Sequence, residues 1–174
     1  MKIKHATVND AKAISSLILE TATAQLRGEF SDHGWDLFLK LLNEETQKSL
    51  IINKKFNYLV AVKDYDDAKP NNEIVGVLVT KDVNHLFHFF IKPSWQGKGL
   101  GKLLWNRAVI EIRNDLSKKQ IKAQNNEESV SVNSSDFALT FYQHLGFLME
   151  AGRQKKNGIC YTPMTFSLSK TIQL

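Results

Sequence analysis

The chain has 174 residues, 43% of them hydrophobic and 24% charged, which is enough to bury a core without metal or disulfide support. It carries one cysteine, which excludes a disulfide framework and a cysteine-rich metal site. No run approaches the roughly 20 apolar residues of a membrane span, and the first residues do not resemble a signal peptide. We therefore expect a soluble cytoplasmic protein with no membrane partner.

The net charge of +5 and the pI near 9.2 raise the question of a polyanionic partner. Nucleic-acid-binding proteins gather such charge into one patch or stripe, whereas here the lysines are scattered along the chain. Lys98 and Lys102 are the exception, because they flank a cluster of glycines. The pattern favours a small polyanion at that cluster and no nucleic acid.

The first half of the chain begins with an α-helical region and continues as a β-rich region. The patterns predict a strand over residues 2–7, a helix over 9–26 with Asn9 or Asp10 as N-cap, a second helix from about Trp35, and strands over 56–63, 73–80 and 83–91. The polar segment 64–72 indicates an antiparallel hairpin between the second and third strands.

The second half alternates helices and strands. We expect a helix from Leu100 to about Arg113, a polar connection over 117–127, a strand over 129–132, a helix over 136–145 closed by Gly146, and strands over 147–153 and 159–168. This order predicts a single α/β domain spanning residues 1–174. Its mixed, mostly antiparallel central sheet would be flanked by helices on both faces.

Three glycines, Gly97, Gly99 and Gly101, stand between a predicted strand and a predicted helix. Successive N–H groups in such a loop converge on an anion, and glycine permits positive φ and close approach of a ligand. A Walker loop is excluded because Leu103 follows Lys102, and the third glycine comes one residue early for a dinucleotide fingerprint. The loop is therefore an anion site of another kind, or else only a flexible connection.

The sequence around these glycines indicates a protein family more specifically than the glycines do alone. "IKPSWQGKGLGKLL" resembles the Gln/Arg-x-x-Gly-x-Gly/Ala signature of the GNAT N-acetyltransferase superfamily, with Gln96, Gly99 and Gly101 in the signature positions and Gly97 as an extra glycine. "SVNSSDFALTFYQHLGF" resembles the second landmark of that family. "IKHATVNDAKAISSLI" and "YTPMTFSL" resemble its opening and closing segments, so the resemblance covers nearly the whole chain.

The resemblance implies acetyl-CoA as cosubstrate. Its pyrophosphate would lie on the loop and helix start, formed by Gln96, Gly97, Lys98, Gly99, Leu100, Gly101 and Lys102. Its pantetheine arm would follow the strand that ends at Ile91, which in the family separates from the strand over 129–132. A backbone N–H near Phe90 or Ile91 would polarise the thioester carbonyl. Asn133 would contact coenzyme A or a bound water, with Ser134 as the lesser choice.

The resemblance also implies direct attack of an amine on the thioester, with no covalent enzyme intermediate. Tyr142 holds the family's position for the acid that protonates the leaving thiolate. For the base, His85 lies eleven residues before Gln96, where some members carry Glu. Its parity matches that of Phe87, Phe89 and Ile91, which makes His88 the poorer candidate, and water is the further alternative. Cys160 is expected to be a buried small hydrophobe, and no metal is expected.

The acceptor is an amine of a small molecule or peptide, and the segments 24–35 and 153–158 would shape its site. Glu29, Asp32 and Asp36 either bind a cationic amine there or are solvated, and Phe30 and Trp35 either line the site or pack in the core. Two other functions are weighed: a catalytically inactive acyl-CoA-binding regulatory module, and a nucleic-acid-binding protein. Exposed strand edges in this fold are compatible with a homodimer.

Overall fold

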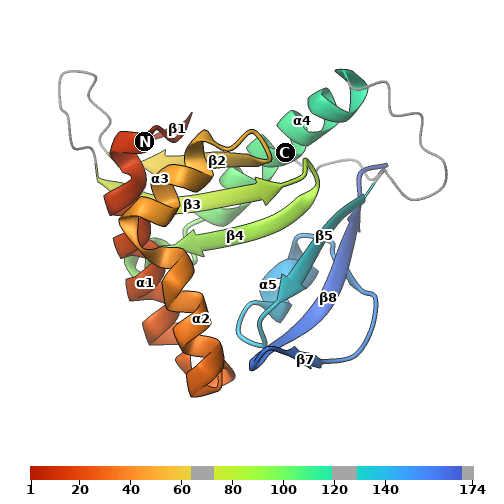
Figure 1. Cartoon of the computed structure of the whole chain (residues 1–174). Coiled ribbons are helices and arrows are strands. Elements are labelled where there is room, and N and C mark those ends of the chain that lie inside the picture. Colours follow the sequence, from red (N-terminus) through yellow and green to blue (C-terminus); the bar gives the residue numbers. More distant parts are fainter. Residues whose placement is uncertain (64–72, 119–128, 170–174) are drawn as a thin grey trace.

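The computed structural model describes residues 1–63, 73–118 and 129–169 (Figure 1). Its helices are α1 (Ala11–Gln25), α2 (Asp32–Leu42), α3 (Glu44–Ile52), α4 (Leu100–Lys118) and α5 (Leu139–His144), with short 3-10 turns η1 (Val8–Asp10), η2 (Arg27–Glu29) and η3 (Pro93–Trp95). Its strands are β1 (Lys2–His5), β2 (Phe56–Val62), β3 (Ile74–Lys81), β4 (His85–Ile91), β5 (Ser129–Ser134), β6 (Leu148–Met149), β7 (Gln154–Lys156) and β8 (Ile159–Ser167).

The strands form a sheet in the order β1-β2-β3-β4-β5-β8-β6, and β7 pairs with β8. Among the described strands, β4 and β5 form the one parallel pair, and every other pair is antiparallel. The predicted mixed, mostly antiparallel sheet is confirmed. No helix in the described ranges is long and apolar enough to cross a membrane.

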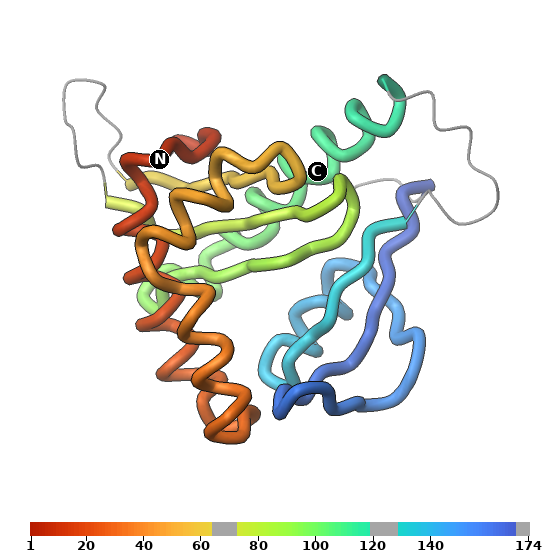
Figure 2. The backbone as a smooth tube through the Cα atoms, viewed as in Figure 1, coloured from red at the N-terminus to blue at the C-terminus, as the bar shows by residue number. Residues whose placement is uncertain are grey.

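Helices cover both faces of the sheet, as predicted. Along β2, Tyr58, Val60 and Val62 face α1 and α2, whereas Leu59 and Ala61 face α4. Figure 2 shows α1, α2 and α3 on one side of the sheet and α4 on the other. Because β2 and β3 are buried on both faces, they read in the sequence as nearly continuous apolar runs.

Several element bounds differ from the sequence prediction because side-chain caps decide them. The second helix begins at Asp32, before Trp35, since Ser31 Oγ accepts the Gly34 N–H at 3.1 Å. Asn43 then caps a third helix, α3, which the sequence analysis did not predict, by accepting the Thr46 N–H at 2.8 Å. Asp10, one of the two predicted N-cap residues, is the N-cap of α1, but its carboxylate accepts the Thr7 N–H at 2.8 Å in the capping box of the preceding turn η1.

The remaining differences lie in the second half. Helix α4 continues to Lys118, α5 is shorter than predicted, and the strand expected over 147–153 is reduced to β6. Strand β7 lies within the segment 153–158, for which no strand was predicted. The predicted turn over 64–72 and most of the predicted connection over 117–127 lie outside the described residues.

Strand β4 contains an irregularity that changes which way its side chains face. Val79 pairs with His88 and Thr80 pairs with Leu86, so Phe87 is an extra residue, which is a β-bulge. As a result Phe87 packs on the α1–α2 side together with Phe90, whereas Phe89 packs on the α4 side. The parity argument is therefore wrong for Phe87, which the bulge moves to the side opposite Phe89. His88 packs against Phe38 of α2, opposite Phe89, as the parity predicted.

Candidate functional site

A cavity of about 680 Å³ opens where β4 and β5 separate. The two strands are in register only at His85–Ser131 and Leu86–Val132, and beyond that point they diverge (Figure 1). Eight residues that the sequence assigned to the site line this one cavity: His85, Phe90, Ile91, Gln96, Gly97, Gly101, Asn133 and Tyr142. The other four assigned residues, Lys98, Gly99, Leu100 and Lys102, do not line it.

The three glycines are required for two different reasons. Gly97 and Gly99 have φ of +70° and +81°, and a Cβ added at either would meet nothing within 4 Å. Their conformation is the left-handed one that glycine adopts at little cost, and the space above them is open. Gly101 is different, because its Cβ would lie 2.9 Å from two ring carbons of Phe141. The missing side chain at Gly101 lets α4 pack closely against α5. This packing is sufficient to explain the glycine, without a ligand approaching it.

The loop leaves a row of N–H groups without a partner in the described chain. The first N–H after Gln96 to bond back is that of Leu103, which donates to Gly99 O at 3.1 Å. The N–H groups of residues 97–102 are thus available at the start of a helix of 19 residues, where the helix dipole adds partial positive charge. This backbone arrangement suits an anion such as a pyrophosphate.

The side chains of the loop support it rather than point at a ligand. Gln96 Nε2 donates to Ile91 O at 2.9 Å, and the Gln96 amide exchanges hydrogen bonds of 3.0 and 3.2 Å with that of Gln25 on α1. Leu100 is buried in the core, while Lys98 Nζ lies 5.6 Å from the Trp95 ring centroid and Lys102 is exposed. Gln96 and Leu100 therefore fix the loop between β4, α1 and the core.

The edge of β4 that faces β5 carries the donor that a bound carbonyl needs. Lys92 N–H donates to Val75 O of β3 at 2.9 Å, so alternation along the antiparallel pair turns the Phe90 N–H towards β3 as well. The Ile91 N–H then points to the other edge, where β5 has already diverged. Of the two residues named from the sequence, Ile91 supplies the free donor.

Tyr142 reaches the cavity from α5. Its side chain is buried and packs against Phe89 and Phe147, with ring centroids 6.4 and 5.3 Å away. Burial raises the pKa of its hydroxyl well above the ordinary value, so the proton is retained near neutral pH. The hydroxyl makes no hydrogen bond within the described chain, which leaves it able to donate to a ligand.

Two histidines, both on β4, line the cavity. His85 Nδ1 lies 2.9 Å from Ser131 Oγ, and its pKa is lowered mainly by burial and then by Lys81, with Asp82 opposing. His88 is 6% exposed, and burial lowers its pKa to about 4. Both imidazoles are therefore neutral near pH 7 and able to accept a proton or a hydrogen bond.

The other predicted polar residues divide between the cavity and its surroundings. Asn133 is exposed and lines the cavity, two residues along β5 from Ser131. Ser134 is fully buried and donates to Ser135 O at 2.8 Å, so it faces away. Cys160 is half-buried on β8 and lines the cavity, which corrects the expectation that it is a core residue. In the described ranges no set of His, Cys, Asp and Glu side chains is grouped to hold a metal ion.

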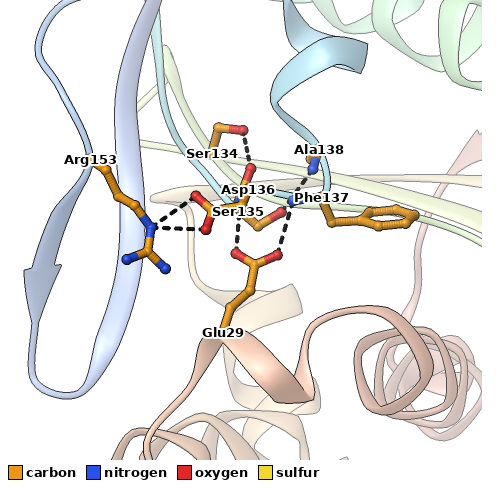
Figure 3. Close-up of polar contacts among 7 residues, drawn as sticks. All are labelled: Glu29, Ser134, Ser135, Asp136, Phe137, Ala138 and Arg153. Carbon is orange, nitrogen blue, oxygen red and sulfur yellow. Dashed lines mark hydrogen bonds and ion pairs between the residues drawn. The ribbon is translucent and has the colours of Figure 1, made fainter.

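Two of the acidic residues considered as ligands for an acceptor amine make contacts within the protein instead. Glu29 accepts the backbone N–H groups of Asp136 and Phe137 at 2.7 and 2.9 Å, and Asp136 pairs with Arg153 at 2.8 Å (Figure 3). These contacts, which we call the Glu29 bridge, join the loop after α1 to the loop after β5. Asp32 pairs with Arg27, and neither it nor Glu29 lines the cavity.

Asp36 is exposed outside the cavity, so the amine-binding role considered for all three acidic residues is not supported by the structure. Of the two aromatic residues in the same segment, Phe30 lines the cavity. Trp35 packs between Phe30 and Phe38, with ring centroids 5.5 and 5.6 Å away.

Solved structures of other proteins share this fold. A GCN5-related N-acetyltransferase from Rhodopseudomonas palustris matches with a TM-score of 0.69 at 18% identity, covering 96% of this chain and 95% of that one. The PaiA N-acetyltransferase of Thermoplasma acidophilum, solved in complex with coenzyme A, matches with a TM-score of 0.68 at 17% identity, covering 96% and 99%. An aminoglycoside 6'-acetyltransferase type Ii matches with a TM-score of 0.63 at 16% identity, covering 97% of each chain.

These likenesses establish a common fold. A search of curated proteins finds no significant sequence match. The model of the acetyltransferase (GNAT) domain, however, matches residues 26–168, which is most of the chain and includes the glycine loop, β4, β5 and α5. The chain therefore belongs to the GNAT acetyltransferase family.

Proposed function

We propose that this protein is an acetyl-CoA-dependent N-acetyltransferase that moves the acetyl group directly to a primary amine. The observation that carries the proposal is that three features meet at one cavity: the open N–H row of residues 97–102, of which Gly97 and Gly101 line the cavity, the free edge of β4 at Ile91, and the Tyr142 hydroxyl. Each feature suits a different part of acetyl-CoA, namely the pyrophosphate, the amide-bearing arm and the thioester. The solved neighbour that contains coenzyme A supports the same assignment.

The residues divide the work of binding. The loop from Gly97 to Lys102 accepts the pyrophosphate on backbone N–H groups, and Lys98 and Lys102 add positive charge from its exposed side. The diverging edge of β4 pairs with the amides of the pantetheine arm in the manner of an added strand. Asn133, on the opposite wall, offers an amide to the same arm.

The chemistry is an addition and elimination at the thioester carbon. The neutral amine nitrogen forms the new C–N bond, the carbonyl oxygen takes up negative charge, and the C–S bond then breaks. Ile91 N–H stabilises the oxygen, Tyr142 delivers its proton to the leaving sulfur, and His85 accepts the proton that the amine loses. The products are an N-acetyl amide and the free thiol of coenzyme A, and Tyr142 regains its proton from solvent or from His85.

Calorimetric titration with coenzyme A, set beside titration with pantetheine, tests the cofactor assignment. Pantetheine lacks the pyrophosphate, so we expect coenzyme A to bind at least about 100-fold more tightly, since the loop binds the missing group. Equal affinities would remove the loop from the site.

Thiol release from acetyl-CoA with a panel of amines then tests the reaction. Tight binding of acetyl-CoA without transfer to any amine would favour the inactive acyl-CoA-binding module.

A further inference from the structure

Two buried polar atoms have no hydrogen-bond partner within the described protein, and both belong to residues that line the same cavity. They are Thr21 Oγ1 on α1 and His88 Nε2 on β4, on side chains that are 3% and 6% exposed. A buried polar atom left unpaired costs about 1–3 kcal/mol, and native proteins rarely leave one so. Because both residues line one cavity, a ligand held there can supply the missing partners.

The surroundings of His88 are aromatic. Its ring centroid lies 4.3 Å from that of Phe87, 5.8 Å from that of Phe90 and 6.4 Å from that of Phe38, which meets it edge-on. Phe30 and Leu41 also line the cavity. A ligand that reaches His88 therefore needs an apolar, preferably flat body, since aromatic side chains favour offset or edge contacts with another ring.

The charge of the cavity argues against a polycation. No Asp or Glu is among the described residues that line it, and Lys156 is the lysine that does. A polyamine or an aminoglycoside carries several ammonium groups, each of which would enter without a carboxylate partner. Burying an unpaired charge is far more costly than burying a hydroxyl.

We propose, on the basis of the acetyltransferase function above, that the acceptor is a hydroxylated arylalkylamine or an amine of the same chemistry. Its aromatic body lies among Phe38, Phe87 and Phe90, its hydroxyl pairs with the His88 imidazole and with Thr21, and its single amine reaches the thioester. His88 is then a specificity-determining residue for the ring, while His85 acts at the amine. In this proposal His88 recognises the acceptor and does not act as the general base.

A comparison of four amines tests the assignment: tyramine, phenethylamine, spermidine and kanamycin. We expect tyramine to have a kcat/KM about ten-fold above that of phenethylamine, because only its hydroxyl pairs with the orphaned atoms, and the two polycations to rank lower still. Calorimetric titration of tyramine and phenethylamine into protein saturated with coenzyme A should show the same order of affinity. Preference for spermidine or kanamycin would overturn the proposal.

Variants separate ring recognition from chemistry. His88→Phe keeps an aromatic ring but removes the nitrogen, and it should lower the tyramine to phenethylamine ratio of kcat/KM from about ten to about one. Thr21→Val, which is nearly isosteric, should also lower that ratio. Tyr58→Phe removes a buried hydrogen bond outside the cavity, to Gln47 Oε1 at 3.0 Å, and should keep the wild-type ratio.

The remaining outcomes discriminate between the two proposals. If His88→Phe folds and lowers kcat/KM for both amines by the same factor, the imidazole serves the transfer itself and the ring assignment is wrong. If His88→Phe does not fold, the Thr21→Val ratio and the calorimetric order in wild-type protein decide. Failure of coenzyme A to bind at all would refute the acetyltransferase function instead, and that measurement involves no amine.

Discussion

The two ends of the cavity offer a ligand different kinds of groups. At the glycine loop the available groups are backbone N–H groups on consecutive residues, and the side chains either support the loop, as Gln96 does, or lie in solvent. At the opposite end they come from side chains on α1, α2, β4 and β8. Backbone N–H groups suit a part of the ligand that is the same in every substrate complex. Side chains from separate elements can be substituted one at a time, which suits a part of the ligand that varies. The difference explains why the first end has a motif and the second has none.

The largest effect should come from adding a charged side chain to the backbone end. Gly99→Glu forces a non-glycine residue into φ of +81° and places a carboxylate beside the N–H row, so we expect the Kd for coenzyme A to rise more than about 100-fold. Gly99→Ala imposes the strain without the charge and should have a smaller effect. Gly152→Glu is the matched control, because Gly152 has open space around it and lies outside the cavity. A folded Gly99→Glu that binds coenzyme A normally would show that the loop is not the anion site.

The next effect concerns the group that lies between the two ends. Tyr142→Phe removes the hydroxyl and keeps the packing, and we expect kcat to fall by about 100-fold while the Kd for coenzyme A changes little. Tyr58→Phe controls for the loss of a buried tyrosine hydroxyl, and it should affect stability rather than kcat. An unchanged kcat in Tyr142→Phe would remove this residue from the chemistry.

The side-chain end should reveal itself through the pH dependence of folding. The pKa of His88 falls from 6.5 to about 4 on folding, so between these values the unfolded state binds more protons than the folded state. The free energy of unfolding should therefore fall as the pH drops below 6.5, by about 2 kcal/mol at pH 5 relative to pH 7 from this group. The pKa of His85 is lowered too, and it contributes in the same direction.

Denaturant titrations of wild type and His88→Phe at both pH values isolate this contribution. The variant should lose most of the pH dependence, and near pH 7 it should be at least as stable as wild type, since it removes an orphaned buried nitrogen. Phe87→Leu, which changes the packing around His88 but keeps the imidazole, serves as the comparison. Equal pH dependence in wild type and His88→Phe would mean that the imidazole is not neutralised by burial.

The smallest effect is expected from the Glu29 bridge, whose charged side chains connect the two sides of the cavity without lining it. In Glu29→Gln the side chain loses its charge and one of its two acceptor oxygens, so we expect a loss of about 1 kcal/mol in stability. The KM for the amine should rise several-fold while the Kd for coenzyme A stays the same. Glu45→Gln, at an exposed carboxylate paired with Lys48, should change neither quantity.

The sequence by itself determined the architecture and the backbone end of the site. Apolar runs marked β2 and β3, helical stripes marked α1 and α4, and the spacing of Gln96, Gly99 and Gly101 located the loop. These features are local, because the residues that specify them are neighbours in the chain. Short-range exceptions such as the Ser31 and Asn43 caps escaped prediction only because many sequences with the same residues form no cap.

Only the tertiary structure decided the side-chain end. The bulge at Phe87 reversed the facing of that residue, and no sequence signal marks a bulge within an apolar run. The orphaned atoms of Thr21 and His88, 67 positions apart, acquire meaning because α1 and β4 border one cavity. From the sequence, Glu29 was a candidate ligand for a cationic amine. In the structure it instead accepts the N–H groups of Asp136 and Phe137, which are distant in the chain. Local spacing specifies which elements form, but the partners of a side chain depend on long-range packing.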